Sequence, residues 1–158
     1  DGAVLRDTRE AITLAPLSAI DVGAYADADL LAGADPASTV AVFTLQVEGE
    51  PASTGVVYFV PAKNVAWRDP GLHTTVRRDR DGYRIEITAA TLARGVWLDA
   101  GDVDAQFHDN ALTVLPGEPV TVHVTSTASD SVLRAALHAR SLRDAMRATN
   151  PTSWKITP

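Results

Sequence analysis

Cysteine is absent from the 158 residues of this chain. That absence excludes disulfide bonds, thiolate metal sites and cysteine nucleophiles, although it does not fix the compartment. No apolar run approaches the roughly 20 residues that a membrane helix needs. The formal charge is −6, and acidic and basic residues are interspersed without a basic stripe. We therefore expect neither a nucleic acid nor a membrane as a partner.

Motifs of several enzyme classes are also missing. The sequence has no His-Glu-x-x-His, no Gly-x-Ser-x-Gly and no glycine-rich phosphate loop. Its histidines are scattered along the chain. They are His73, His108, His123 and His138. We therefore expect no metal site and no cofactor.

One acidic cluster, Asp99, Asp102 and Asp104, surrounds Gly101. Glycoside hydrolysis needs two carboxylates that converge from rigid elements, about 5–10 Å apart. A calcium site is the lesser alternative, since the spacing is not that of an EF-hand loop. The glycine favours a solvated turn, so the sequence offers no catalytic residue in this cluster.

Alternating apolar residues dominate the chain and predict β-strands. Residues 39–48 and 56–60 form two apolar runs around a turn-rich stretch, Gly49–Gly55, and predict a hairpin. The strand at 56–60 is expected to be buried. In residues 39–48, the face that carries Ala41, Phe43, Leu45 and Val47 is the expected core side.

A second hairpin is predicted over residues 73–89, with Asp81-Gly82 as a type I′ turn pair. Tyr83, Ile85 and Ile87 alternate with polar residues and are expected to be buried. Further short strands are predicted around residues 96–98 and 120–124. Short strands with turns every ~8–12 residues are typical of an all-β sandwich.

The segment FHDNALTVLPGEPVTVHV (residues 107–124) resembles the C-terminal immunoglobulin-like domain of β-mannosidases in glycoside hydrolase family 2. An aromatic-x-Asp-Asn and a Leu-Pro-Gly-Glu before a valine-rich strand carry the resemblance. The matching residues are Phe107, Asp109, Asn110, Leu115, Pro116, Gly117 and Glu118. YFVPAKNVAW, YRIEITAATLARGVWLD and LRAALHARSLRDA follow the family pattern in the right order. Ala111 departs from it, because many relatives have an aromatic residue there.

The resemblance implies an immunoglobulin-like β-sandwich, with one complete domain preceded by part of a second. The expected domains are residues 1–61, the latter part of one sandwich, residues 62–146, the complete sandwich, and a tail at 147–158. The parent enzyme would be a retaining β-mannosidase that acts on terminal β-mannose. Its two glutamates would lie on a (β/α)₈ barrel outside this chain, which we expect to begin inside a longer polypeptide.

The expected partners are therefore the rest of the parent glycosidase, including its catalytic barrel, and the oligosaccharide substrate of that enzyme. Phe107, Asp109, Asn110, Pro116 and Gly117 are expected to have structural roles, because Asp-Asn and Pro-Gly favour bends. Trp67 and Trp154 are candidates for contact with carbohydrate or with another domain. A free-standing carbohydrate-binding or structural interaction module is the alternative function.

Residues 130–146 carry conflicting signals. An Asp-Ser start and good helix formers favour a helix. The family resemblance instead implies a final strand over residues 132–139, followed by a turn at 141–144. We adopt the strand as the expectation.

Overall fold

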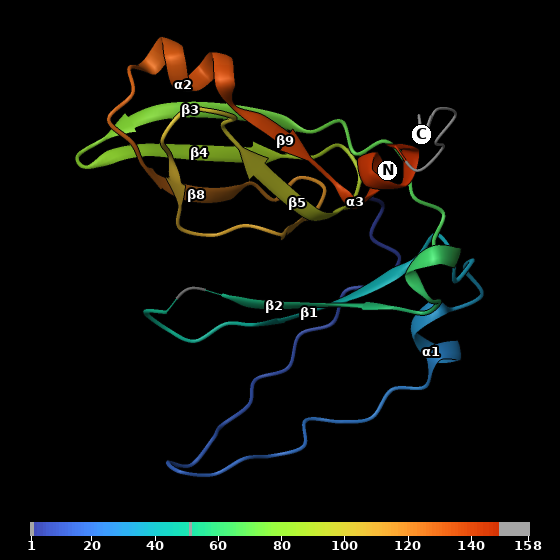
Figure 1. Cartoon of the computed structure of the whole chain (residues 1–158). Coiled ribbons are helices and arrows are strands. Elements are labelled where there is room, and N and C mark those ends of the chain that lie inside the picture. Colours follow the sequence, from blue (N-terminus) through green and yellow to red (C-terminus); the bar gives the residue numbers. More distant parts are fainter. Residues whose placement is uncertain (1, 51, 149–158) are drawn as a thin grey trace, which may run out of the picture. The chain divides into compact units, whose positions relative to one another are not determined.

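The computed structural model describes residues 2–50 and 52–148. The described chain forms two compact units, one of residues 6–67 and one of residues 2–5 and 68–148 (Figure 1). Each unit has its own antiparallel pairing, and each is described by itself. In the described part of the chain, no helix is long and apolar enough to cross a membrane.

The smaller unit is built around one hairpin. Helix α1 (Asp27–Leu31) precedes strands β1 (Val40–Leu45) and β2 (Ser53–Tyr58), and the 3₁₀ helix η1 (Ala62–Asn64) follows. The strands pair antiparallel, from Val40 opposite Tyr58 to Leu45 opposite Ser53. The predicted hairpin is therefore present. The boundary expected at 61/62 falls at the start of η1 and stays a prediction.

The smaller unit has no buried residue among those described. Phe43 is 44% exposed, Leu45 50% and Val57 45%. The expectation that one face of residues 39–48 and the strand at 56–60 are buried is thus wrong for this chain. The physical reason is that two strands alone cannot cover an apolar face, which needs a second layer of structure.

The larger unit contains two antiparallel sheets. The first has the order β3-β4-β8-β6, and Figure 1 shows β3, β4 and β8 side by side. Its strands are β3 (His73–Asp79), β4 (Gly82–Thr88), β8 (Val120–Thr125) and β6 (Gln106–Phe107). The second sheet has the order β7-β5-β9. Its strands are β7 (Leu112–Val114), β5 (Ala93–Asp99) and β9 (His138–Arg140).

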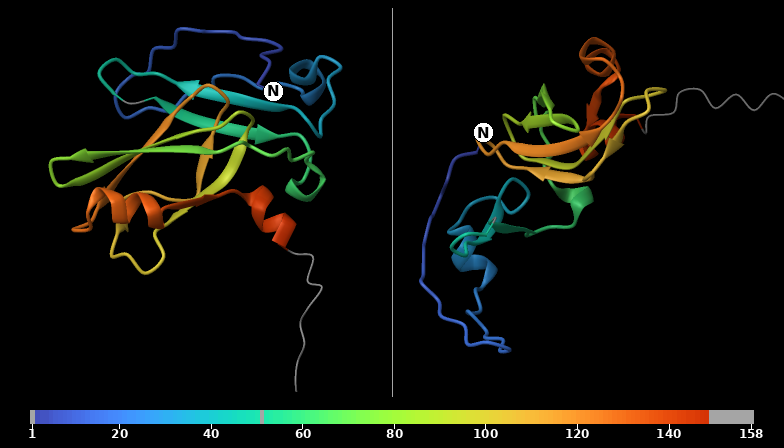
Figure 2. Two further views of the ribbon diagram at one scale, coloured as in Figure 1. Left: turned by 90° about the horizontal axis from the view of Figure 1, so that it is seen from above. Right: turned by 90° about the vertical axis from the view of Figure 1, so that its left-hand side faces the viewer.

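Two short helices flank β9 in the larger unit. Helix α2 (Asp130–Ala136) precedes this strand and α3 (Leu142–Ala148) follows it, so the helices lie at its opposite ends (Figures 1 and 2). Helix α2 contributes Leu133, which is fully buried, to the core. Its Arg134 donates a hydrogen bond to the carbonyl of Val76 and ties the helix to β3.

The core of the larger unit lies between its two sheets. Tyr83, Ile85 and Ile87 on β4 are at most 1% exposed, as the alternation predicts. Both sheets and α2 supply the remaining buried apolar side chains. These are Val76, Ala89, Ala93, Val96, Leu98, Ala100, Leu112, Val114, Val122, Val124 and Leu133. At about 1.5–3 kcal/mol for each large apolar side chain, their burial is the main force that holds the sandwich together.

Two local expectations are corrected by the structure. Residues 130–136 form helix α2, so the strand expected over 132–139 is limited to β9, and the turn expected at 141–144 is the start of α3. The local helix propensity of these residues therefore predicts their structure better than the family resemblance does. The helix also places the side chain of Leu133 in the core. The second hairpin turns at Arg80-Asp81, since Asp79 pairs with Gly82.

Gly82 therefore has a role other than that of a turn residue. Its φ is +155°, and a Cβ at this position would lie 2.1 Å from the carbonyl oxygen of Val124 on the neighbouring strand β8. Glycine is therefore required by the close approach of two strands rather than by a type I′ turn.

Candidate functional site

The signature segment, residues 107–118, carries the chain from one sheet of the sandwich to the other and back. Phe107 ends β6, pairs with Val124 and packs half-buried against the core. The next residue, His108, donates its backbone N–H to the carbonyl of His123 over 3.0 Å. The chain then leaves the first sheet and enters β7 of the second.

Asn110 fixes this crossover. Its Oδ1 accepts the backbone N–H of Leu98 at 2.7 Å, and its Nδ2 donates to the Leu98 carbonyl at 2.9 Å. Asp109 accepts the backbone N–H of Asn110 at 2.7 Å, and Ala111 follows with a φ of +58°. The Asn110 amide therefore pairs with β5 as a neighbouring strand would, which is a structural role.

Pro116 and Gly117 form the return turn between β7 and β8. The N–H of Glu118 donates to the carbonyl of Leu115 at 3.2 Å, and Gly117 has a φ of +77° that favours glycine. Neither residue presents a reactive group. The structure thus places all five signature residues in the crossover and its return, and their structural role stays a prediction for those other than Asn110.

The two tryptophan candidates have different outcomes. Trp67 donates its ring N–H to the carbonyl of Ala62 at 2.7 Å, and its ring centre lies 5.8 Å from that of Tyr58. It is half-buried within the smaller unit. Trp154 lies outside the described residues. Contact of either ring with carbohydrate or with another domain stays a prediction.

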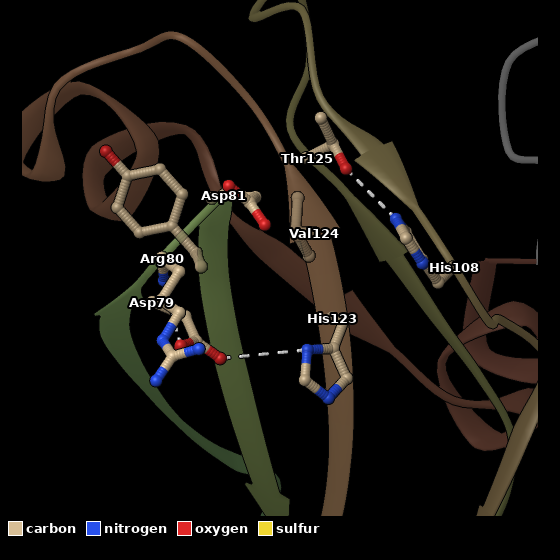
Figure 3. Close-up of a pocket in the computed structure, with 9 residues that line it drawn as sticks. Asp79, Arg80, Asp81, His108, His123, Val124 and Thr125 are labelled. Carbon is tan, nitrogen blue, oxygen red and sulfur yellow. Dashed lines mark hydrogen bonds and ion pairs between the residues drawn. The ribbon is translucent and has the colours of Figure 1, made fainter.

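A shallow pocket of about 340 Å³ lies where the β3–β4 turn meets β8 (Figure 3). Asp79, Arg80 and Asp81 come from the turn, whereas His123 and Thr125 come from β8, and His108 follows β6. Gly82, Tyr83 and Val124 complete the lining.

Polar contacts connect the side chains around this pocket. Asp79 Oδ2 accepts from Arg84 Nη2 at 3.1 Å and lies 3.9 Å from His123 Nδ1. His108 Nε2 and Thr125 Oγ1 are 3.0 Å apart, and the two imidazole centres are 6.5 Å apart. The Arg80 backbone N–H, which donates to Oδ1 at 2.8 Å, lowers the pKa of Asp79. Partial desolvation opposes this shift and Arg84 adds to it.

The pocket has no arrangement suited to glycoside hydrolysis. Its two carboxylates, Asp79 and Asp81, belong to one tight turn, and Asp79 is already paired with Arg84. Retaining glycosidases instead need a nucleophile and an acid on either side of the scissile bond. In residues 2–50 and 52–148, no three His, Asp or Glu side chains are grouped to hold a metal ion.

The proximity of His108 and His123 was missed by the sequence analysis, which treated the histidines one at a time. The register of β6 against β8 could have revealed it. Phe107 pairs with Val124 in an antiparallel register. The residue after Phe107 is His108 and the residue before Val124 is His123, so the two histidines lie opposite each other.

Comparison with protein families covers nearly the whole chain. Residues 67–145 match an Ig-fold domain model of mannosidases, and residues 1–64 match the mannosidase Ig/CBM-like domain. No curated protein matches the chain. The order of the two matches and the all-β sandwich confirm the expected immunoglobulin-like fold. The chain therefore belongs to the Ig-fold domains of mannosidases, as a non-catalytic, C-terminal immunoglobulin-like region of a mannosidase-type glycoside hydrolase.

Proposed function

We propose that this chain is the non-catalytic part of a retaining β-mannosidase of glycoside hydrolase family 2, which removes terminal β-mannose residues. The observation that carries the proposal is the order of the two mannosidase domain matches along one chain. The signature segment supports it, because its Asn110 pairs with both backbone groups of Leu98 in the sandwich.

The two units would contribute differently to the parent enzyme. The larger unit has a core of its own, so it would fold around Leu98, Ile85 and Val122 without help. The smaller unit leaves apolar side chains such as Phe43 and Leu45 about half exposed. We infer that residues 1–61 are the latter part of a sandwich that other parts of the enzyme complete.

The catalytic groups of the parent would lie elsewhere, on a (β/α)₈ barrel that carries the acid/base and the nucleophile glutamates. The present chain would bury apolar surface against the rest of the enzyme and shape the surroundings of its pocket. The barrel and the oligosaccharide substrate are thus the proposed partners.

The test is to assay the full parent enzyme on aryl β-mannoside, α-mannoside and β-galactoside, with this chain alone as the matched control. The proposal expects the parent to prefer the β-mannoside and the isolated chain to leave all three substrates unchanged. A parent that prefers another glycoside would refute the β-mannosidase assignment. Hydrolysis by the isolated, purified chain would refute its non-catalytic role.

A carbohydrate-binding module is the second candidate, and Trp97 favours it. This side chain is 54% exposed on β5, between two buried residues, and an exposed indole face stacks well on sugars. Retention of the chain on insoluble mannan, lost in Trp97→Ala and kept in Phe43→Ala, would support this function. Equal passage of all three proteins through the mannan would reject it.

A further inference from the structure

Trp97 stands out on the outer face of the second sheet, β7-β5-β9. The exposed residues of these three strands are Thr113, Trp97, His138 and Arg140. Trp97 is thus the one exposed large apolar side chain on the strands of this sheet, and it is 54% exposed. Its neighbours along β5, Val96 and Leu98, are at most 1% exposed and belong to the core. Buried side chains therefore fix the backbone that presents the indole to solvent.

Two polar side chains of β9 lie beside this ring. Strand β9 runs along β5 (Figure 1), and Trp97 pairs with Arg140 while Asp99 pairs with His138. The residues between them turn towards the core, so these four side chains project from the outer face. Directly opposite residues have Cβ atoms about 4.5–5.5 Å apart, and diagonal neighbours are about 7–8 Å apart. A molecule that covers the indole can therefore reach Arg140 directly and His138 along the diagonal.

These side chains are not engaged within the sandwich. In residues 2–50 and 52–148, the Arg140 guanidinium and the His138 imidazole make no hydrogen bond or ion pair, and Trp97 makes no ring or cation–π contact. The guanidinium offers only donors, whereas a neutral imidazole offers one donor and one acceptor. The ring and the hydrogen-bonding groups beside it are thus all open to a ligand.

The composition of this surface distinguishes between possible occupants. The buried core of a protein interface is mostly apolar, whereas here one aromatic ring lies among polar side chains. The charge of Arg140 is offset by that of Asp99, and Arg94, farther along β5, is already engaged. The paired positions therefore supply no net charge to attract a polyanion. An uncharged sugar fits best, because its C–H face stacks on indole and its hydroxyls accept and donate hydrogen bonds.

We propose that Trp97, Arg140 and His138 form a shallow platform that binds the pyranose rings of an uncharged glycan. Trp97 stacks on one sugar ring, Arg140 donates to the hydroxyls at its side, and His138 contacts the hydroxyls along the diagonal. This inference rests on the carbohydrate-binding candidate under the proposed function, and it adds the residues of the site and the charge of the ligand. It does not depend on the β-mannosidase activity.

The test is calorimetric titration of the full chain with two uncharged glycans, mannohexaose and cellohexaose, and with an oligogalacturonate of the same length. The platform predicts saturable binding of at least one uncharged glycan, and binding of the acidic oligomer at least about tenfold weaker. Trp97→Ala should weaken the binding of the glycan at least about fivefold, and Trp97→Phe, which keeps a smaller ring, should weaken it less. Arg140→Ala should weaken it about fivefold through the lost hydrogen bonds.

Phe43→Ala is the matched control, because Phe43 is an aromatic strand residue of similar exposure, 44%, in the smaller unit. It should bind the glycan as the unmodified chain does. Circular dichroism checks that each variant is folded.

Three results would overturn the proposal. They are no binding of either uncharged glycan, binding that a folded Trp97→Ala variant retains in full, and tighter binding of the acidic oligomer. A dimer in sedimentation that Trp97→Ala dissociates would show that a second copy of the chain, not a glycan, occupies this face. Hydrolysis of aryl β-mannoside by the parent enzyme tests the β-mannosidase assignment separately, so either idea can fail while the other stands.

Discussion

Asn110 offers the sharpest test of the structural interpretation of the signature segment. Replacing it with alanine removes the amide that pairs with both backbone groups of Leu98, at 2.7 and 2.9 Å. Leu98 is only 1% exposed, so water cannot easily replace the lost partner. We therefore expect Asn110→Ala to destabilise the larger unit.

The magnitude follows from the two hydrogen bonds. Each contributes about 0.5–1.5 kcal/mol net, and leaving a buried donor or acceptor unpaired costs about 1–3 kcal/mol. For the pair we expect a loss of about 2–4 kcal/mol, a large part of the roughly 5–15 kcal/mol that keeps a domain folded. Asp109→Ala is the control. Its carboxylate is exposed and accepts only the neighbouring N–H, so we expect a loss of less than about 1 kcal/mol.

Two measurements check this prediction. Urea unfolding followed by circular dichroism gives the free energy of unfolding of each variant. Hydrogen exchange of the Leu98 amide gives a local measure, and it should be faster in Asn110→Ala but not in Asp109→Ala. If Asn110→Ala unfolds at the same urea concentration as the unmodified chain and protects Leu98 equally, the structural role assigned to this side chain is wrong.

Two further predictions concern the larger unit. Gly82→Ala should lower the free energy of unfolding by at least about 2 kcal/mol, because its Cβ would lie 2.1 Å from the Val124 carbonyl oxygen. Gly101→Ala is the control and should cost only about 1 kcal/mol, since nothing lies within 4 Å of a Cβ at that position. Equal melting temperatures of the two variants would contradict this prediction. At the start of α3, the N–H and hydroxyl of Ser141 donate to Asp144 Oδ2 and lower the pKa of Asp144. The folded pKa lies below the unfolded one, so this contribution is present at neutral pH and is lost as pH falls below the ordinary value of 3.8. Thermal melts should show Asp144→Ala less stable than the unmodified chain at pH 7, and a constant difference down to pH 2 would refute the linkage.

Much of the sandwich can be predicted from the sequence because its signals are local. Tyr83, Ile85 and Ile87 alternate with polar residues, and each is buried as expected. The role of Asn110 as a bend residue also follows from residue type. Its pairing with Leu98 does not, because a contact across 12 residues depends on how the two sheets are placed.

Where prediction failed, tertiary contacts decided the outcome. The apolar pattern around Phe43 predicts a buried face. The described residues of the smaller unit do not cover this face, so Phe43 stays exposed. A strand was expected where helix α2 forms, and the buried side chain of Leu133 joins the core from this helix. The proximity of His108 and His123 depends on strand register, which histidine spacing alone does not reveal.

The central proposal is that the carboxylates of Asp99, Asp102, Asp104 and Asp109 take no part in hydrolysis. The most direct measurement is kcat of the full parent enzyme on an aryl β-mannoside after four substitutions, Asp99→Asn, Asp102→Asn, Asp104→Asn and Asp109→Asn. Asparagine keeps the turn hydrogen bonds, such as the one from Gly101 to Asp99, but cannot act as an acid or a nucleophile. The account predicts a kcat within about twofold of the unmodified enzyme, whereas a fall of about a hundredfold or more in a correctly folded protein would contradict it.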